Sequence, residues 1–153
     1  MTPAPLRHAG REGREPIHRH TVVVREDAVD ENGHVNNVQY VQWMQDAAVA
    51  HSESAGCTRL TRDEGATWVA RSHHIEYLRP AFPGERVTVL TWVSNWRKVR
   101  SLRRYRFVRE SDGAVLARGE TDWVFVDAAG GRPRNIPAAV AHAFVLVAPE
   151  REP

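Results

Sequence analysis

The sequence is poor in cysteine, and this excludes several kinds of protein. Only one of the 153 residues is a cysteine, Cys57. A single thiol cannot form an intramolecular disulfide or a cysteine-based metal cluster, so we expect a protein of the reducing cytoplasm. The histidines have no acidic partners at a matching spacing, and His73 and His74 would face opposite ways on a strand. We therefore expect no metal site.

Long apolar runs are also missing. No stretch approaches the ~20 residues of a transmembrane helix. The N-terminal residues carry charges and prolines, so we expect no secretory signal there. The formal net charge is only +2, which is too small to indicate DNA as a partner but is compatible with a small polyanionic ligand.

What the sequence does contain indicates one α+β domain. A chain of 153 residues, 42% of them hydrophobic, can bury a sizeable core. Residues 1–18 are rich in Pro, Gly and Arg and are expected to form a mobile tail. Residues 147–153 are expected to form a second tail, which leaves residues 19–146 for the domain.

Within the domain, the spacing of apolar residues predicts a long helix followed by strands. Residues 37–54 lack Pro and Gly, and on a helical wheel one arc holds Tyr40, Val41, Trp43, Met44, Ala47, Ala48 and His51. Residues 57–65 are interpreted as a connecting turn. Strands are predicted at 20–25, 67–78, 86–96, 101–110 and 114–126, and a short helix near 138–144. The predicted layout is one long helix wrapped by an antiparallel sheet of about five strands.

Such a wrapped helix leaves part of the sheet exposed. Trp92, Trp96 and Trp123 are candidates for that exposed surface. Partner subunits commonly cover a sheet surface of this kind, so we expect a homodimer or homotetramer.

Residues suited to acyl transfer precede the long helix. Asp27 and Asp30 are followed by Gly33, which permits a tight turn, and by the N-cap candidates Asn36 and Asn37. The first N–H groups of a helix have no internal partner and stabilise negative charge. A carboxylate beside them would supply a base or nucleophile together with an oxyanion donor. Asp27 is interpreted as a structural turn residue.

A family resemblance rests on the same stretch. The pattern Asp27-x-x-Asp30-x-x-Gly33-His34-Val35-Asn36-Asn37-x-x-Tyr40-x-x-Trp43 resembles the active-site signature of hotdog-fold acyl-CoA thioesterases, the 4-hydroxybenzoyl-CoA thioesterase-like group. Segments 75–80, 84–89, 96–98 and 134–137 are similar to that family's strands in order and spacing. The likeness covers residues 22–144.

The resemblance implies roles for individual residues. Asp30 would be the catalytic carboxylate, as nucleophile or as general base for water, and the Asn37 N–H the oxyanion donor. His34 would orient Asp30 or the water, or act as a hydrogen-bonded turn residue. Tyr40 and Trp43 lie where they could shape the acyl pocket.

The resemblance also implies a place for the coenzyme. Arg97, Lys98 and Arg100 near a strand-to-strand turn would contact its phosphates, while the other arginines up to Arg109 would face solvent. Coenzyme A would be part of the substrate, and no metal or redox cofactor is implied.

A second, narrower resemblance concerns the loop alone. Asp30-x-Asn32-x-His34 is similar to a spacing in plant acyl-carrier-protein thioesterases. Those enzymes carry an acidic residue and a Cys after a Glu-Tyr-Arg-Arg run, whereas Pro80 and Ala81 stand at the matching positions here.

We interpret the chain as a cytoplasmic thioesterase for an acyl-CoA or acyl-carrier-protein thioester, with sites built from two subunits and no nucleic-acid or membrane partner. Three alternatives remain open. These are a hotdog dehydratase or hydratase, a non-catalytic acyl-CoA-binding protein, and an RNA-binding surface of Arg and Trp residues.

Overall fold

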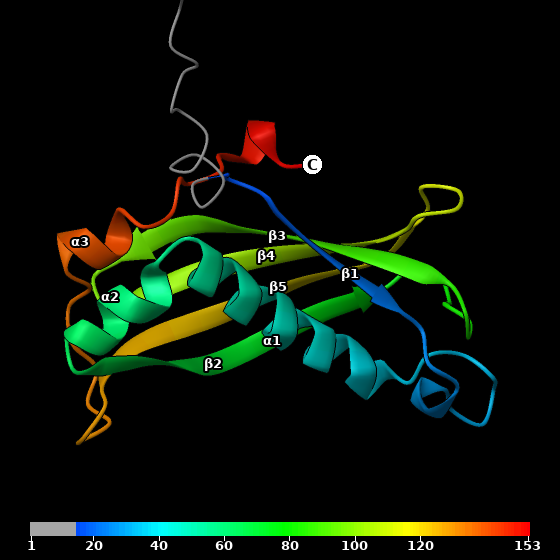
Figure 1. Cartoon of the computed structure of the whole chain (residues 1–153), viewed down its shortest axis with the longest axis horizontal. Coiled ribbons are helices and arrows are strands. Elements are labelled where there is room, and N and C mark those ends of the chain that lie inside the picture. Colours follow the sequence, from blue (N-terminus) through cyan, green and yellow to red (C-terminus); the bar gives the residue numbers. More distant parts are fainter. Residues whose placement is uncertain (1–14) are drawn as a thin grey trace, which may run out of the picture.

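The computed structural model describes residues 15–153. Most of the predicted N-terminal tail therefore lies outside the described residues. The described elements, in chain order, are β1 (His18–Val23), η2 (Glu26–Ala28), α1 (Asn37–Ser54), α2 (Cys57–Asp63), β2 (Ala66–Tyr77), β3 (Arg86–Arg97), β4 (Arg100–Arg109), β5 (Val115–Asp127), α3 (Ala138–Ala141) and η3 (Pro149–Arg151) (Figure 1).

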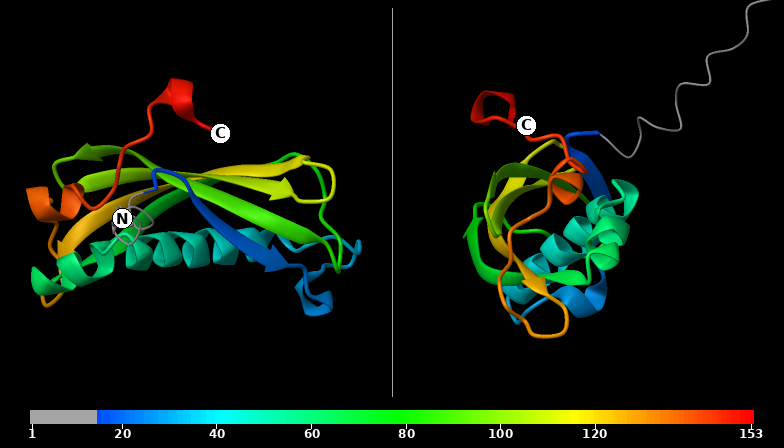
Figure 2. Two further views of the ribbon diagram at one scale, coloured as in Figure 1. Left: turned by 45° about the horizontal axis from the view of Figure 1, so that its top comes forward. Right: turned by 90° about the vertical axis from the view of Figure 1, so that its left-hand side faces the viewer.

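The strands form one antiparallel sheet of five strands in the order β1-β3-β4-β5-β2. The sheet curves around α1, which runs along its inner face (Figure 2). This arrangement confirms the α+β layout of one long helix against a five-stranded antiparallel sheet. No helix among the described residues is long and apolar enough to cross a membrane.

The long helix has the predicted bounds, and its apolar arc forms the core. Of that arc, Val41 alone is only partly buried; the other members are buried: Tyr40, Trp43, Met44, Ala47, Ala48 and His51. Gly119 on β5 lies under this arc, where an added Cβ would come within 3.1 Å of the Met44 side chain. The glycine therefore lets the helix approach the sheet closely.

The segment after α1 corrects the sequence prediction. Residues 57–65 were predicted to be a turn, but α2 occupies Cys57–Asp63. Gly56, with φ of +81°, reverses the chain and immediately caps a new helix, which buries Cys57 and Thr61. A helix of seven residues is too short for apolar periodicity to reveal it.

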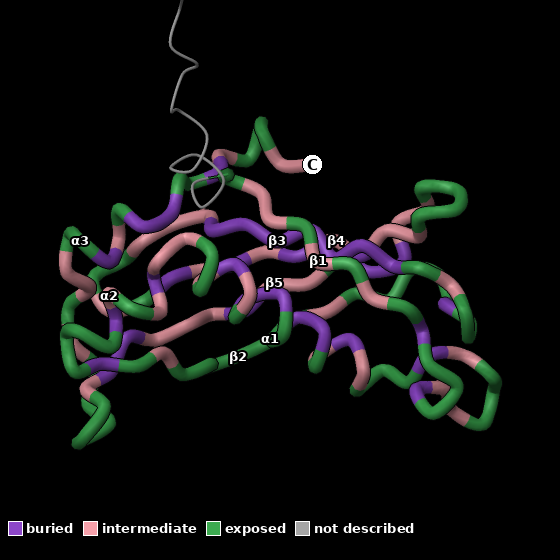
Figure 3. The backbone as a smooth tube through the Cα atoms, viewed as in Figure 1, coloured by how far each residue is buried: buried purple, intermediate pink, exposed green. Residues whose placement is uncertain are grey.

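The prediction of an exposed tryptophan surface is wrong for Trp92, whereas Trp96 and Trp123 are partly buried. Trp92 is only 2% exposed, because it packs with Leu90 of the same strand and with Ile17 and Val147 from the two terminal segments. The Val147 N–H donates to the Val93 carbonyl at 3.0 Å. Residues 147–153, expected to be a tail, thus lie against the sheet. Figure 3 shows purple, buried backbone along much of β3.

Candidate active site

The turn before α1 fixes the carboxylate of Asp30. Its Oδ1 accepts hydrogen bonds from the backbone N–H groups of Asn32 at 2.9 Å and His34 at 3.3 Å. Its backbone N–H donates to the His34 carbonyl at 2.7 Å, and Gly33, with φ of +75°, closes the turn. Within residues 15–153, Oδ2 accepts no hydrogen bond. One carboxylate oxygen therefore anchors the side chain and the other is free to act on a ligand.

The cap of α1 leaves one backbone amide free. The Asn36 side-chain oxygen accepts from the N–H of Val38 at 3.0 Å, and its carbonyl accepts from the N–H of Gln39 at 2.9 Å. The N–H of Asn37 has no acceptor in the part of the chain that the structure describes. This free amide at the positive end of an 18-residue helix is suited to stabilise an oxyanion.

Two aromatic side chains border this helix start. The His34 ring packs edge-on against Phe82 with centroids 5.3 Å apart, and no hydrogen bond joins it to the Asp30 carboxylate in residues 15–153. The Tyr77 hydroxyl donates to the Asn37 carbonyl at 3.0 Å. This bond fixes the end of β2 beside the helix start, a contact across 40 residues that no local pattern signals.

Tyr40 and Trp43, the expected walls of the acyl pocket, lie on the buried arc of α1, and Tyr40 packs edge-on against Tyr77 with ring centroids 5.3 Å apart. Both are buried in the core against Phe107 of β4, with the Tyr40 and Phe107 centroids 5.1 Å apart. Neither lines the cavity described below. The reason is their place on the apolar arc of α1, which faces the sheet.

The three expected phosphate ligands lie at the other end of the molecule. Arg97, Lys98 and Arg100 flank the β3–β4 turn, where Arg100 is paired with Asp122. The Lys98 carbonyl accepts from the N–H of Ile136, close to α3 and far from the start of α1 (Figure 1). One chain alone therefore does not bring these basic residues to Asp30.

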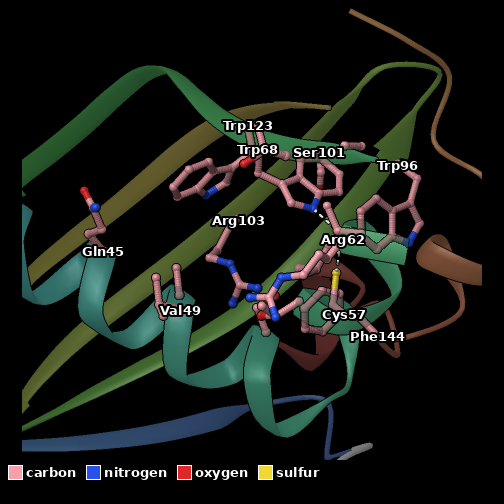
Figure 4. A pocket seen from close by; sticks show the side chains of 17 residues that line it. Gln45, Val49, Cys57, Arg62, Trp68, Trp96, Ser101, Arg103, Trp123 and Phe144 are labelled. Atoms are coloured by element: carbon pink, nitrogen blue, oxygen red, sulfur yellow. Dashed lines mark hydrogen bonds between the residues drawn. The ribbon is translucent and has the colours of Figure 1, made fainter. Parts of the chain in front are cut away.

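A cavity of about 330 Å³ lies at that same end, between the second half of α1, α2 and the start of β2 (Figure 4). Its aromatic walls are Trp68, Trp96, Trp123 and Phe144. Arg103, which the sequence analysis assigned to solvent, also lines it and is only 4% exposed. Strand alternation gives the reason, since Ser101, Arg103, Tyr105 and Phe107 share the buried face of β4.

Arg103 is held by neutral partners. Its Nη1 donates to His51 Nδ1 at 2.8 Å and to Thr91 Oγ1 at 3.1 Å. Burial and the neighbouring Arg103 lower the pKa of His51 to about 3, so the imidazole is neutral and accepts this bond. Burial also lowers the pKa of Arg103.

Because His51 is neutral in the folded protein, we expect the free energy of unfolding to depend on pH. Its pKa in the folded protein is about 3, against 6.5 when unfolded, so between these values the unfolded chain binds a proton that the folded chain does not. This contribution is complete above pH 6.5 and is lost as the pH falls, by at most about 1.4 kcal/mol per unit.

Urea unfolding at pH 7.5 and 5.5 measures the effect. The free energy of unfolding should fall more between these pH values in the wild type than in His51→Gln, whose amide oxygen can still accept from Arg103. Equal losses in the two proteins would show that His51 does not carry this pH dependence.

Comparisons with known proteins agree with this architecture. A profile described as "Thioesterase-like superfamily" matches residues 23–144. The chain is 30% identical over 129 residues to an L-carnitine dehydrogenase/betainyl-CoA thioesterase of Agrobacterium fabrum. That match covers 84% of this chain but only 26% of the relative, so the chain spans about a quarter of its length.

Solved structures confirm the hotdog fold. The 12:0-ACP thioesterase from Umbellularia californica superposes with a TM-score of 0.77 at 22% identity, over 86% of this chain and 52% of that one. A DHNA-CoA thioesterase from Staphylococcus aureus gives a TM-score of 0.70 at 20% identity, over 78% of this chain and 80% of that one.

Proposed function

Because the chain belongs to the thioesterase-like superfamily, we propose that it hydrolyses an acyl-CoA or acyl-carrier-protein thioester to a free acid and a thiol. The observation that carries this proposal is that, within residues 15–153, the turn before α1 leaves Asp30 Oδ2 without a hydrogen bond and the cap of α1 leaves the Asn37 N–H without one. The names of the similar proteins support a thioester of coenzyme A or acyl carrier protein.

The chemistry follows from these two groups. Asp30 either takes a proton from a water that attacks the thioester carbonyl, or attacks that carbon itself to form an anhydride that water then opens. In both routes the carbonyl oxygen becomes negative and accepts a hydrogen bond from the Asn37 N–H. Cleavage of the C–S bond releases the thiolate, which leaves as the thiol after protonation.

We further propose that two copies pair through β2. This 12-residue strand bonds only to β5 among the described strands, so its outer edge is unpaired. Val69 and Tyr77 on it are 45% and 44% exposed. Long unpaired edge strands are normally covered, and a second copy of the same edge is the simplest cover.

Such pairing would also complete the site. Antiparallel pairing of β2 with itself sets its first residue, Ala66, opposite Tyr77 of the partner subunit. Tyr77 is bonded to Asn37, whereas Ala66 and Trp68 line the cavity. The helix start of one copy would then lie beside the cavity and the basic β3–β4 turn of the other. Arg97 and Lys98 would meet the coenzyme phosphates there.

The assembly is tested by mass in solution. Light scattering coupled to size exclusion should give at least twice the mass of one chain, and Val69→Lys, which places a charge on the edge, should lower that mass. A monomeric wild type would contradict the shared site.

The reaction is tested by thiol release. With a panel of acyl-CoAs, a thiol reagent should detect free coenzyme A in stoichiometric amounts with the acid. A hydratase or dehydratase would instead change the absorbance of an enoyl thioester without releasing thiol, and a non-catalytic binder would retain acyl-CoA unchanged. A cytoplasmic location remains part of the proposal and rests on the single cysteine.

A further inference from the structure

The cavity contains a buried charge without a counter-charge. Arg103 is 4% exposed and makes two hydrogen bonds, both from Nη1 and both to neutral groups, His51 and Thr91. No carboxylate pairs with it within residues 15–153. A guanidinium has five donors, so several remain available for another partner.

Three other arginines on β4 have the carboxylate partners that Arg103 lacks among the described residues. Arg100 pairs with Asp122, Arg104 with Glu120 and Glu152, and Arg109 with Glu85 and Asp112. These arginines are more exposed than Arg103, which is the buried one. Burying a charge is costly unless it is paired, so the cavity is electrostatically incomplete when empty.

The residues around Arg103 indicate which kind of ligand group would pair with its charge. The guanidinium carbon lies 5.1 Å from the centre of the Phe144 ring, and Trp68, Trp96 and Trp123 form the other walls. A second guanidinium, that of Arg62 on α2, lines the same cavity and extends toward Arg103 (Figure 4). Two cations within aromatic walls suit a short organic group that ends in an anion.

We propose that this cavity binds the far end of the acyl group, and that this end carries a carboxylate that pairs with Arg103. The inference rests on the proposed thioesterase function and specifies its substrate class, the monothioesters of dicarboxylic acids. The cavity volume of about 330 Å³ is at the lower end of the roughly 300–1,000 Å³ of small-molecule sites, which suits an acyl end as short as that of adipoyl.

Other acyl ends fit the cavity less well. A neutral alkyl end would bury the guanidinium without a partner. A quaternary ammonium, as the name of the Agrobacterium relative implies for that protein, would gain from the aromatic rings but would meet the positive Arg103. For this chain, betainyl-CoA is therefore expected to be a poor substrate.

Matched substrate pairs test the inference. The kcat/KM for thiol release should be roughly 10- to 100-fold higher for adipoyl-CoA than for hexanoyl-CoA, as expected for loss of a charged hydrogen bond. Arg103→Met should abolish this ratio by lowering kcat/KM for adipoyl-CoA. Arg104→Met, whose side chain is on the opposite face of β4, should keep the ratio.

The results of these assays distinguish a failure of the carboxylate assignment from a failure of the proposed thioesterase function. Equal kcat/KM for the two substrates in the wild type would overturn the carboxylate assignment and leave the thioesterase intact. If no acyl-CoA is cleaved, the proposed function fails. Calorimetric titration then decides the cavity's ligand, since hexanoate, which ends in a carboxylate, should bind the wild type more tightly than the neutral hexanamide does, and equal binding would overturn the inference. These wild-type measurements hold even if Arg103→Met does not fold.

Discussion

Replacing Asp30 by Asn should lower kcat for thioester hydrolysis by roughly 10²- to 10⁴-fold, the usual contribution of a general base. The side-chain oxygen of Asn can accept the same two hydrogen bonds that Asn32 and His34 donate to Oδ1. Only the free oxygen is replaced, by an NH₂ group that can neither deprotonate water nor attack a carbonyl. The thermal midpoint should therefore stay within a few degrees of the wild type.

Asp27→Asn provides the matched control for this substitution. Asp27 belongs to the same loop but, among residues 15–153, pairs only with Arg25, and both side chains are exposed. Its substitution should change kcat less than about twofold, since exposed ion pairs contribute little. Near-normal turnover in Asp30→Asn would contradict the assigned role of Asp30.

Filling the cavity should have the second largest effect. Val49 lines the cavity from α1 and is 47% exposed, so Val49→Trp adds volume there without removing a hydrogen bond. For an acyl group that reaches the cavity, kcat/KM should fall roughly 100-fold, because a pocket discriminates by 10- to 200-fold for even one methylene.

Substrate length supplies the internal control. Acetyl-CoA is too short to enter the cavity, so its kcat/KM should be equal in Val49→Trp and in the wild type. Val145→Trp, a change at another exposed position that does not line the cavity, should affect neither substrate. A parallel loss for acetyl-CoA and adipoyl-CoA would mean that the cavity does not receive the acyl group.

Local patterns in the sequence predicted the elements but not their contacts. The 37–54 helix and all five strands follow from local residue patterns, and the turn at Gly113 follows from its neighbours Ser111 and Asp112. The contact of Tyr77 with Asn37 and the burial of Trp92 depend on segments distant in the chain. Tertiary contacts of this kind leave no periodic signal.

The candidate site shows the same difference between features set by local sequence and features set by tertiary contacts. Asp30 and Asn37 lie seven residues apart, so the turn that holds Asp30 and the cap that precedes Asn37 could both be predicted from one short stretch of sequence. The role of Arg103 was missed because a run of basic residues on a strand is typical of a solvent-exposed edge. Its alternation with Tyr105 and Phe107 at every second position could have indicated that Arg103 shares their buried face. The cavity itself requires α2, which the sequence analysis interpreted as a turn.

A mixing experiment tests the central claim most directly, namely that one copy supplies Asp30 and the other supplies the cavity. Asp30→Asn and Val49→Trp are each expected to be nearly inactive on adipoyl-CoA. Random reassociation of equal amounts should make about half of the dimers mixed, each with one intact site, and so restore about a quarter of wild-type activity. Activity no greater than that of the unmixed variants would contradict the shared site.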